Sequence, residues 1–180
     1  MRTCRPRSPT ASGSAGFAAG DVTGAVQLVP EANQAGYVAA TNAVKGLAAR
    51  RPSGHGPLGS FTDPEFASVG LTEPQARADH DVVVVSLGFD QTTRSIIDGH
   101  AEGFCKLIVD RETRQILGGH VVGERAVDIA QVAYMAMQGG VDVVRLAQMP
   151  LSFPTYAGML ARVAHHAAQE LGVDVALGPR

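Results

Sequence analysis

The amino-acid sequence predicts an α+β fold: a largely antiparallel sheet with flanking helices on one side. Two observations predict it. Residues 66–122 hold short runs rich in β-branched and aromatic residues, whereas residues 126–171 show the spacing of amphipathic helices. Strands that come together, followed by helices that come together, favour an antiparallel sheet. A strand–loop–helix fragment is predicted ahead of this part, within residues 17–50.

Four strands are predicted, at residues 66–71, 82–89, 104–110 and 116–122. Thr72 follows the first strand and is a suitable N-cap for a short helix that runs to about Ala78. Cys105 lies in the third strand and is predicted to be a buried core thiol.

The third and fourth strands form a predicted β-hairpin, because a turn of about five residues joins them. The charged residues of Asp110–Arg114 predict a solvated hairpin tip. Gly118 and Gly119 predict close backbone packing or a β-bulge, since no Gly-Lys-Ser/Thr follows them to make a phosphate loop.

Three helices are predicted in the C-terminal part of the chain. The first ends at Gly139–Gly140, the second covers Val141–Ala147, and the third starts after Pro154. The third carries an apolar stripe at helical spacing, formed by Tyr156, Met159, Leu160, Val163, Ala164, Ala167 and Leu171. Together with Leu151 and Phe153, this stripe is expected to leave an exposed apolar patch in a monomer, which two-fold pairing would cover.

The N-terminal part opens with a Ser-, Pro- and Arg-rich stretch that predicts a disordered leader or a misassigned start. Phe17–Ala19 predicts the end of a buried strand, and Pro30 suits the first turn of a helix that reaches about Leu47. The predicted boundaries are a leader at 1–16, a fragment of a larger domain at 17–50, a linker at 51–60, a main domain at 61–174 and a tail at 175–180.

The bulk properties exclude several classes of function. The net charge is −2 and no Lys/Arg stripe follows the first few residues, so binding to nucleic acid is not expected. No apolar run reaches the ~18 residues of a membrane span. The sequence has no secretory signal pattern, and we therefore expect a cytoplasmic protein.

The cysteine and histidine positions predict no metal or dithiol site. Cys4 and Cys105 lie far apart and form no CxxC pair. The adjacent His165 and His166 would point about 100° apart on a helix, so they cannot easily share one metal ion.

Four segments carry a resemblance to a known family: AAGDVTG, FTDPEFASVGLTEPQA, GFCKLIVDRETRQILGGHVVGERAVDIAQ and LSFPTYAGML. In this order and spacing, the sequence resembles the class I pyridine nucleotide–disulfide oxidoreductases, such as dihydrolipoamide dehydrogenase and mercuric reductase. The resemblance covers about Phe17 to Gly172. It implies the last strand and helix of an FAD-binding domain, followed by a whole dimerisation domain. It also implies FAD as cofactor, NAD(P) as electron carrier and a homodimer.

The resemblance implies a wall of the flavin site near the N-terminus. Asp21 would accept a hydrogen bond from the ribityl chain, and Gly20 would let the backbone approach closely. Leu28 and Val29 would lie at the pyrimidine end of the flavin, and the helix from Pro30 would point its N-terminus at flavin N1 and O2. The alternative is that Asp21 only ends a strand and caps a loop. The dinucleotide fingerprint GxGxxG does not occur in the sequence, so the pyrophosphate and adenine would need contacts from elsewhere.

No catalytic residue is predicted. The family places a His-Pro-Thr and a nearby Glu where this sequence has Phe153-Pro154-Thr155 and Gly158, and neither Phe nor Gly can transfer a proton. Phe153 is predicted to pack in an interface core, and Pro154 to follow a cis peptide. Tyr156 is expected either to pack or to hydrogen-bond across the dimer.

Two functions follow from this interpretation. The first is the C-terminal dimerisation portion of an FAD-dependent NAD(P)H oxidoreductase, truncated and inactive alone, which would pair with a separately encoded FAD- and NAD(P)-binding portion. The second is a stand-alone homodimerisation module, or a gene remnant, without a cofactor.

Overall fold

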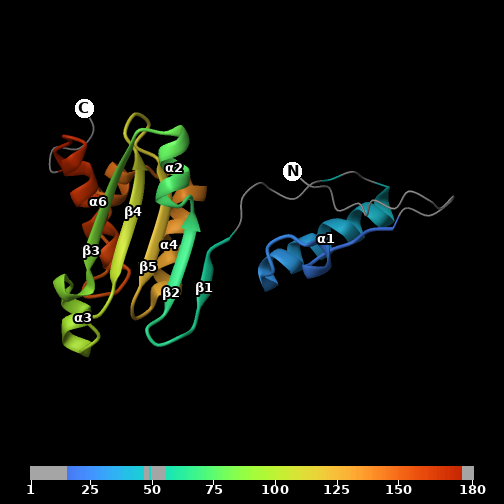
Figure 1. Ribbon diagram of the computed structural model, residues 1–180, viewed down its shortest axis with the longest axis horizontal. Coiled ribbons are helices and arrows are strands. Elements are labelled where there is room, and N and C mark those ends of the chain that lie inside the picture. Colours follow the sequence, from blue (N-terminus) through green and yellow to red (C-terminus); the bar gives the residue numbers. More distant parts are fainter. Residues whose placement is uncertain (1–15, 47–48, 50–55, 176–180) are drawn as a thin grey trace. The chain divides into compact units, whose positions relative to one another are not determined.

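The computed structural model describes residues 16–46, 49 and 56–175, and the chain divides into two compact units between Gly56 and Pro57 (Figure 1). In the first unit, a short 3₁₀-helix η1 (Asp21–Thr23) precedes the helix α1 (Val29–Lys45). The helix has Pro30 in its first turn, as predicted, and ends at Gly46 in a left-handed conformation. Residues 17–19 are not a strand, which corrects the prediction. A strand needs a neighbour for its backbone hydrogen bonds, and the described part of this unit contains none.

The second unit is built on a five-stranded sheet with the order β1-β2-β5-β4-β3, in which every neighbouring pair is antiparallel. This confirms the predicted sheet. Its strands are β1 (Leu58–Ser60), β2 (Phe66–Gly70), β3 (Val82–Gly88), β4 (Phe104–Asp110) and β5 (Ile116–Val122). The three-residue strand β1 falls within the segment that the sequence predicts as a linker. It is too short to show a strand period.

Helices cover both faces of the sheet, unequally (Figure 1). The larger layer on one face consists of α4 (Ala126–Gln138), α5 (Val143–Gln148) and α6 (Gly158–Glu170). The short α2 (Glu73–Asp79) lies on the opposite face, so the prediction of helices on one side only is wrong for α2. Its predicted start is confirmed, because the Gln75 side chain accepts a hydrogen bond from the backbone N–H of Thr72 at 2.9 Å. The connection from β3 to β4 forms a 3₁₀-helix η2 (Phe89–Gln91) and the helix α3 (Thr93–Asp98), neither of which was predicted.

Alternation along β4 divides the core between these two layers. Cys105, Leu107 and Val109 are buried in the large cluster that includes α4 and α6, whereas Ile108 is buried with Ala76 of α2. All four β4 residues have no exposed surface. Complete burial of such a side chain contributes roughly 1.5–3 kcal/mol, so β4 helps to stabilise the packing on both faces of the sheet.

The apolar stripe of α6 is buried within its own chain. Met159, Leu160, Val163, Ala164 and Ala167 all belong to the large core cluster, and α6 packs against β3, β4 and α5. This corrects the expectation of a patch left exposed in a monomer: the helix-covered face of the sheet is what the stripe buries.

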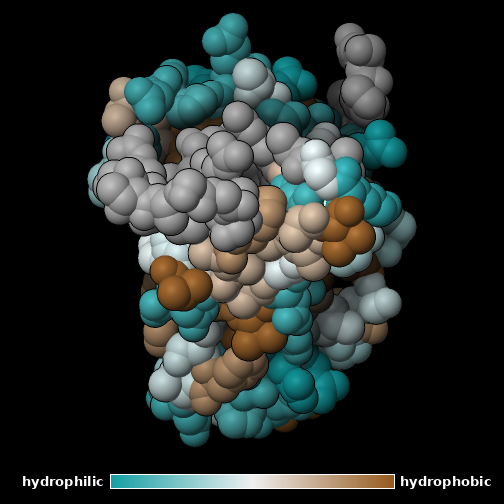
Figure 2. Space-filling model, turned by 90° about the vertical axis from the view of Figure 1, so that its right-hand side faces the viewer, coloured by the Kyte–Doolittle hydropathy of each residue, from teal (hydrophilic) through white to brown (hydrophobic). Residues whose placement is uncertain are grey.

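Large hydrophobic side chains nevertheless remain exposed in both units, and Figure 2 shows hydrophobic side chains at the surface among hydrophilic ones. They include Val22, Val29, Tyr37 and Val44 in the first unit, and Phe61, Phe66, Ile96, Ile97, Met135 and Phe153 in the second.

At the tip of the β4–β5 hairpin, residues 111–114 are exposed, which confirms the predicted solvated tip except at Asp110. Asp110 is buried rather than solvated: its carboxylate accepts hydrogen bonds from the backbone N–H and hydroxyl of Thr113 at 2.7 and 2.9 Å, and pairs with His80 at 2.7 Å. The close packing predicted for Gly118 is confirmed, because a Cβ there would lie 2.1 Å from the carbonyl oxygen of Leu71. The pairing of β4 with β5 also shifts register between Ile108, which lies opposite Gly118, and Val109, which lies opposite Ile116. This confirms an irregularity of the bulge kind at this place.

Candidate functional site

Gly20 starts the segment that the resemblance assigns to the flavin. It has a φ of 76°, which favours glycine, and a Cβ at this position would lie 3.4 Å from Cβ of Ala32. The Gly20 carbonyl accepts hydrogen bonds from the hydroxyl of Thr23 at 2.7 Å and from its backbone N–H at 3.0 Å. These hydrogen bonds close the turn of residues 20–23.

The other predicted flavin residues lie at the surface of the first unit. Asp21 and Pro30 are exposed, Leu28 is half-buried and Val29 is 74% exposed. Leu28 is the N-cap of α1, and its carbonyl accepts the backbone N–H of Ala32 at 2.9 Å. Its apolar side chain cannot accept a hydrogen bond from the first N–H groups of α1.

These residues fit one part of a flavin site. The Asp21 carboxylate can only accept hydrogen bonds at neutral pH, which suits sugar-like hydroxyl groups. The positive end of the 17-residue helix α1 suits an oxygen or nitrogen that carries negative charge. Asp21 and the start of α1 would form only one side of such a site.

The second candidate region is the segment before α6. The hydroxyl of Thr155 donates to the carbonyl of Ser152 at 2.8 Å and accepts the backbone N–H of Gly158 at 3.1 Å, which closes a tight turn. The peptide between Phe153 and Pro154 is cis, as predicted. The Phe153 side chain projects from this turn and is 80% exposed.

Tyr156 ties this turn to α3. Its hydroxyl donates to Oδ2 of Asp98 at 3.0 Å, and its ring packs on Phe89 with 6.2 Å between centroids. The same Asp98 oxygen accepts Nε–H of Arg94 at 2.7 Å. Tyr156 thus both packs and hydrogen-bonds within its own chain.

These contacts shift the titration of each group. Hydrogen bonds from Arg94 and then from Tyr156 hold the pKa of Asp98 below its usual value. Burial, and then the bond to Asp98, raise the pKa of Tyr156 to about 12, so the phenol stays protonated at physiological pH. The Asp98 carboxylate in turn raises the pKa of Arg94. The trio is therefore a structural clamp rather than an acid–base pair.

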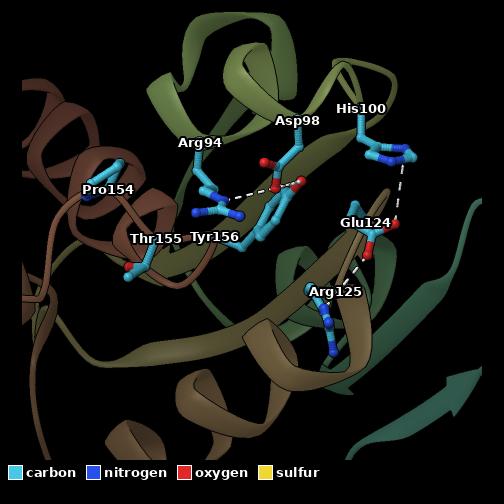
Figure 3. Close-up of a pocket in the computed structure, with 8 residues that line it drawn as sticks. All are labelled: Arg94, Asp98, His100, Glu124, Arg125, Pro154, Thr155 and Tyr156. Atoms are coloured by element: carbon cyan, nitrogen blue, oxygen red, sulfur yellow. Dashed lines mark hydrogen bonds and ion pairs between the residues drawn. The ribbon is translucent and has the colours of Figure 1, made fainter.

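The clamp borders a pocket of 510 Å³, which Figure 3 shows. Its lining comes from three segments far apart in the sequence: α3 with His100 two residues beyond its end, the β5–α4 connection, and the turn before α6. The lining residues are Arg94, Asp98, His100, Glu124, Arg125, Pro154, Thr155 and Tyr156. Sequence analysis missed this pocket. The i,i+4 pair of Arg94 and Asp98, followed by Gly99, was a usable signal for α3.

Other reactive groups are few in the part of the chain that the structure describes. Cys105 is fully buried, as predicted, and burial raises the pKa of its thiol to about 12. Within residues 16–46, 49 and 56–175, no group of three or more His, Cys, Asp or Glu side chains is placed to hold a metal ion. The same residues contain no helix with the length and apolar character that crossing a membrane requires.

Comparison with known proteins identifies the second unit. The family model of the pyridine nucleotide-disulphide oxidoreductase dimerisation domain matches residues 57–164. This chain belongs to that family. The match confirms the resemblance carried by the three segments that lie within residues 57–164, and makes the second unit a dimerisation domain of the FAD-dependent pyridine nucleotide–disulfide oxidoreductases.

Individual relatives are similar over more of the chain. Mercuric reductase from Lysinibacillus sphaericus is 37% identical over 142 residues, which are 78% of this chain and 26% of that protein. Dihydrolipoyl dehydrogenase from Halobacterium salinarum is 33% identical over 152 residues, which are 84% of this chain and 32% of that protein. The chain thus spans about a quarter to a third of the length of the curated relatives it matches.

A solved structure shows the same fold. The HOCl-induced flavoprotein disulfide reductase RclA from Escherichia coli superimposes with a TM-score of 0.75 at 26% identity, over 82% of this chain and 34% of that one. This likeness and the family match confirm the predicted antiparallel sheet with flanking helices.

Proposed function

We propose that this chain is the C-terminal dimerisation portion of an FAD-dependent NAD(P)H oxidoreductase. Residues 61–174 hold two copies together, and residues 17–50 contribute one wall of the flavin site. The single observation that carries the proposal is the family match over residues 57–164. When bound, the flavin passes electrons from NAD(P)H to an acceptor. The chain itself would hold the two copies together and form one side of the flavin site.

Phe153 is the residue through which we propose that the two copies meet. It is 80% exposed, although Thr155 and Tyr156 hold the turn beside it in a defined conformation. A large aromatic side chain on a rigid turn is a typical anchor of a protein interface, because little freedom is lost when it is buried.

A pair of matched substitutions tests this interface. Phe153→Asp would place a charge in the dimer contact, whereas Phe61→Asp changes a phenylalanine of similar exposure, 83%, elsewhere on the unit. Burial of a Phe contributes roughly 1.5–3 kcal/mol and occurs twice in a two-fold dimer. Sedimentation equilibrium should therefore show dimer association weakened by at least on the order of 100-fold for Phe153→Asp. Equal effects of both substitutions would refute the assignment of Phe153.

For the flavin wall, we propose that the Asp21 carboxylate holds the ribityl hydroxyls and that Gly20 allows the close approach. The backbone of Leu28 and Val29 and the α1 N-terminus at Pro30 face the flavin ring. The exposure of this surface and the position of its residues at the start of α1 support the assignment. The dinucleotide-binding regions would come from the FAD- and NAD(P)-binding portion, as a separate polypeptide in the cytoplasm.

The alternative is a homodimerisation module that binds no cofactor. The two functions differ in flavin binding once the nucleotide-binding portion of a relative is supplied. The mixture with this chain should retain FAD on a desalting column, and Asp21→Asn should release it faster. If the mixture retains no more FAD than the nucleotide-binding portion alone, and Asp21→Asn makes no difference, the result would favour the alternative.

A further inference from the structure

The pocket beside the Tyr156 clamp is lined by charged side chains on two sides. Arg94 and Asp98 project from α3, while Glu124 and Arg125 project from the β5–α4 connection (Figure 3). Between them, Asp98 and Tyr156 already satisfy one another. The volume of 510 Å³ lies within the range of small-molecule sites, which is about 300–1,000 Å³. The pocket is therefore large enough for a small ligand, and its charged groups decide which kind.

Arg94 can bind an anion without leaving the clamp. Its Nε–H donates to Asp98 at 2.7 Å, and a guanidinium has further N–H groups in the same plane. The Arg94 side chain is 43% exposed, so a ligand can reach these groups. Arginine binds carboxylates in a planar, two-pronged geometry, and a carboxylate is the anion that best fits this arrangement.

Glu124 can bind a cation. The basic side chains that pair with it are Arg125, with Nε at 3.5 Å, and His100, with Nδ1 at 4.0 Å, and both distances exceed that of a strong charge-assisted hydrogen bond. The side chains of His100 and Arg125 are themselves more than half exposed, so solvent screens these pairs. The Glu124 carboxylate thus retains capacity for an ammonium group.

We propose that this pocket binds a small zwitterion, with Arg94 on the ligand carboxylate and Glu124 on the ligand ammonium. The class of ligand is an amino acid or a short peptide with free termini. A ligand with both charges matches both sides of the pocket, whereas a simple anion leaves Glu124 facing like charge. The site needs neither flavin nor NAD(P), but two of its lining residues, Pro154 and Thr155, adjoin Phe153, through which we propose that the two copies meet.

Glycylglycine is the probe for the test, because it carries both charges on a short backbone. Binding to the full chain is followed by ¹H–¹⁵N chemical shifts of the backbone amides. Two analogues each lack one charge: N-acetylglycylglycine has only the carboxylate, and glycylglycinamide has only the ammonium. Shifts should concentrate at residues 94–100, 124–125 and 154–156, and each analogue should bind about ten-fold or more weakly than glycylglycine.

Two variants assign the charges. Arg94→Gln should lower the affinity for glycylglycine to that of glycylglycinamide, and Glu124→Gln should lower it to that of the acetylated analogue. Arg77→Gln is the matched control, because Arg77 forms a similar i,i+4 pair with Glu73 outside the pocket. Glu124→Gln leaves the clamp intact, so it tests the site even if Arg94→Gln loosens the fold. Absence of localised shifts, equal binding of all three compounds, or an unaltered Glu124→Gln variant would overturn the proposal.

Discussion

Substitution by alanine should change the stability of the fold very differently at two neighbouring glycines of β5, Gly118 and Gly119. In Gly118→Ala, the new Cβ would lie 2.1 Å from the carbonyl oxygen of Leu71 and 3.2 Å from its carbonyl carbon. These are backbone atoms, and the N–H of Leu71 holds them in place by donating to the carbonyl of Leu117 at 2.8 Å. The clash cannot be relieved by turning a side chain. We therefore expect destabilisation at or above the range of about 1–3 kcal/mol that overpacking costs.

In Gly119→Ala, the new Cβ would point to the other face of the sheet. It would lie 3.5 Å from Cβ of Ala133, from Cδ2 of Leu107 and from Cγ1 of Val69, which is ordinary van der Waals contact. The added methyl group also reduces the freedom of the unfolded chain, which stabilises by roughly 0.4–1 kcal/mol where the backbone conformation is compatible. The free energy of unfolding should therefore stay within about 1 kcal/mol of the wild type.

Urea unfolding of the full chain, followed by circular dichroism at one protein concentration, separates the two outcomes. Gly118→Ala should lower the midpoint with an unchanged m value, while Gly119→Ala should leave the midpoint near that of the wild type. In thermal unfolding, each kcal/mol corresponds to roughly 2–4 °C for a chain of this size. A Gly119→Ala variant as unstable as Gly118→Ala would refute the register and the packing described for β5.

Three further predictions concern burial. Hydrogen bonds from the backbone and hydroxyl of Thr113, and then from His80, lower the pKa of Asp110 to about 2, below its value in an unfolded chain. Asp110 therefore stabilises the fold above about pH 4, and this contribution is lost as the pH falls toward 2. Asp110→Asn should remove that part of the acid dependence of the urea midpoint, and an unchanged slope would contradict it. Ile129→Ala should cost about 2–5 kcal/mol because Ile129 is fully buried in α4, whereas the exposed Met135→Ala on the same helix should change stability by less than about 0.5 kcal/mol in the same assay. Iodoacetamide should modify Cys105 only after denaturation, because its thiol is buried with a pKa of about 12, and rapid labelling of the native chain, read by mass spectrometry of its peptide, would argue against this packing.

The sequence was sufficient to predict the sheet where local pattern and burial agree. Residues 104–110 alternate, and the structure buries Cys105 and Leu107 on one face and Ile108 on the other. The strand β1 escaped prediction because it spans only three residues, too few for an alternation to show. The six-residue helix α3 was missed although its Arg94–Asp98 pair and the following Gly99 were usable signals.

What covers an apolar surface could not be predicted from local pattern. The stripe on α6 was predicted correctly, but a stripe states only that one face is apolar, and here the partner is the chain's own sheet. Asp110 shows the same limit, because one of its partners, His80, lies 30 residues away. The pocket of Arg94, Glu124 and Tyr156 joins three distant segments, so no single stretch of sequence signals it.

The mass of the chain in solution is the most direct test of the claim that residues 61–174 hold two copies together. Light scattering behind size exclusion should be measured at micromolar concentration, with circular dichroism to confirm that the sample is folded. Our account predicts a mass twice the 18.7 kDa of the chain. A folded species that stays at the mass of one chain across this concentration range would contradict it.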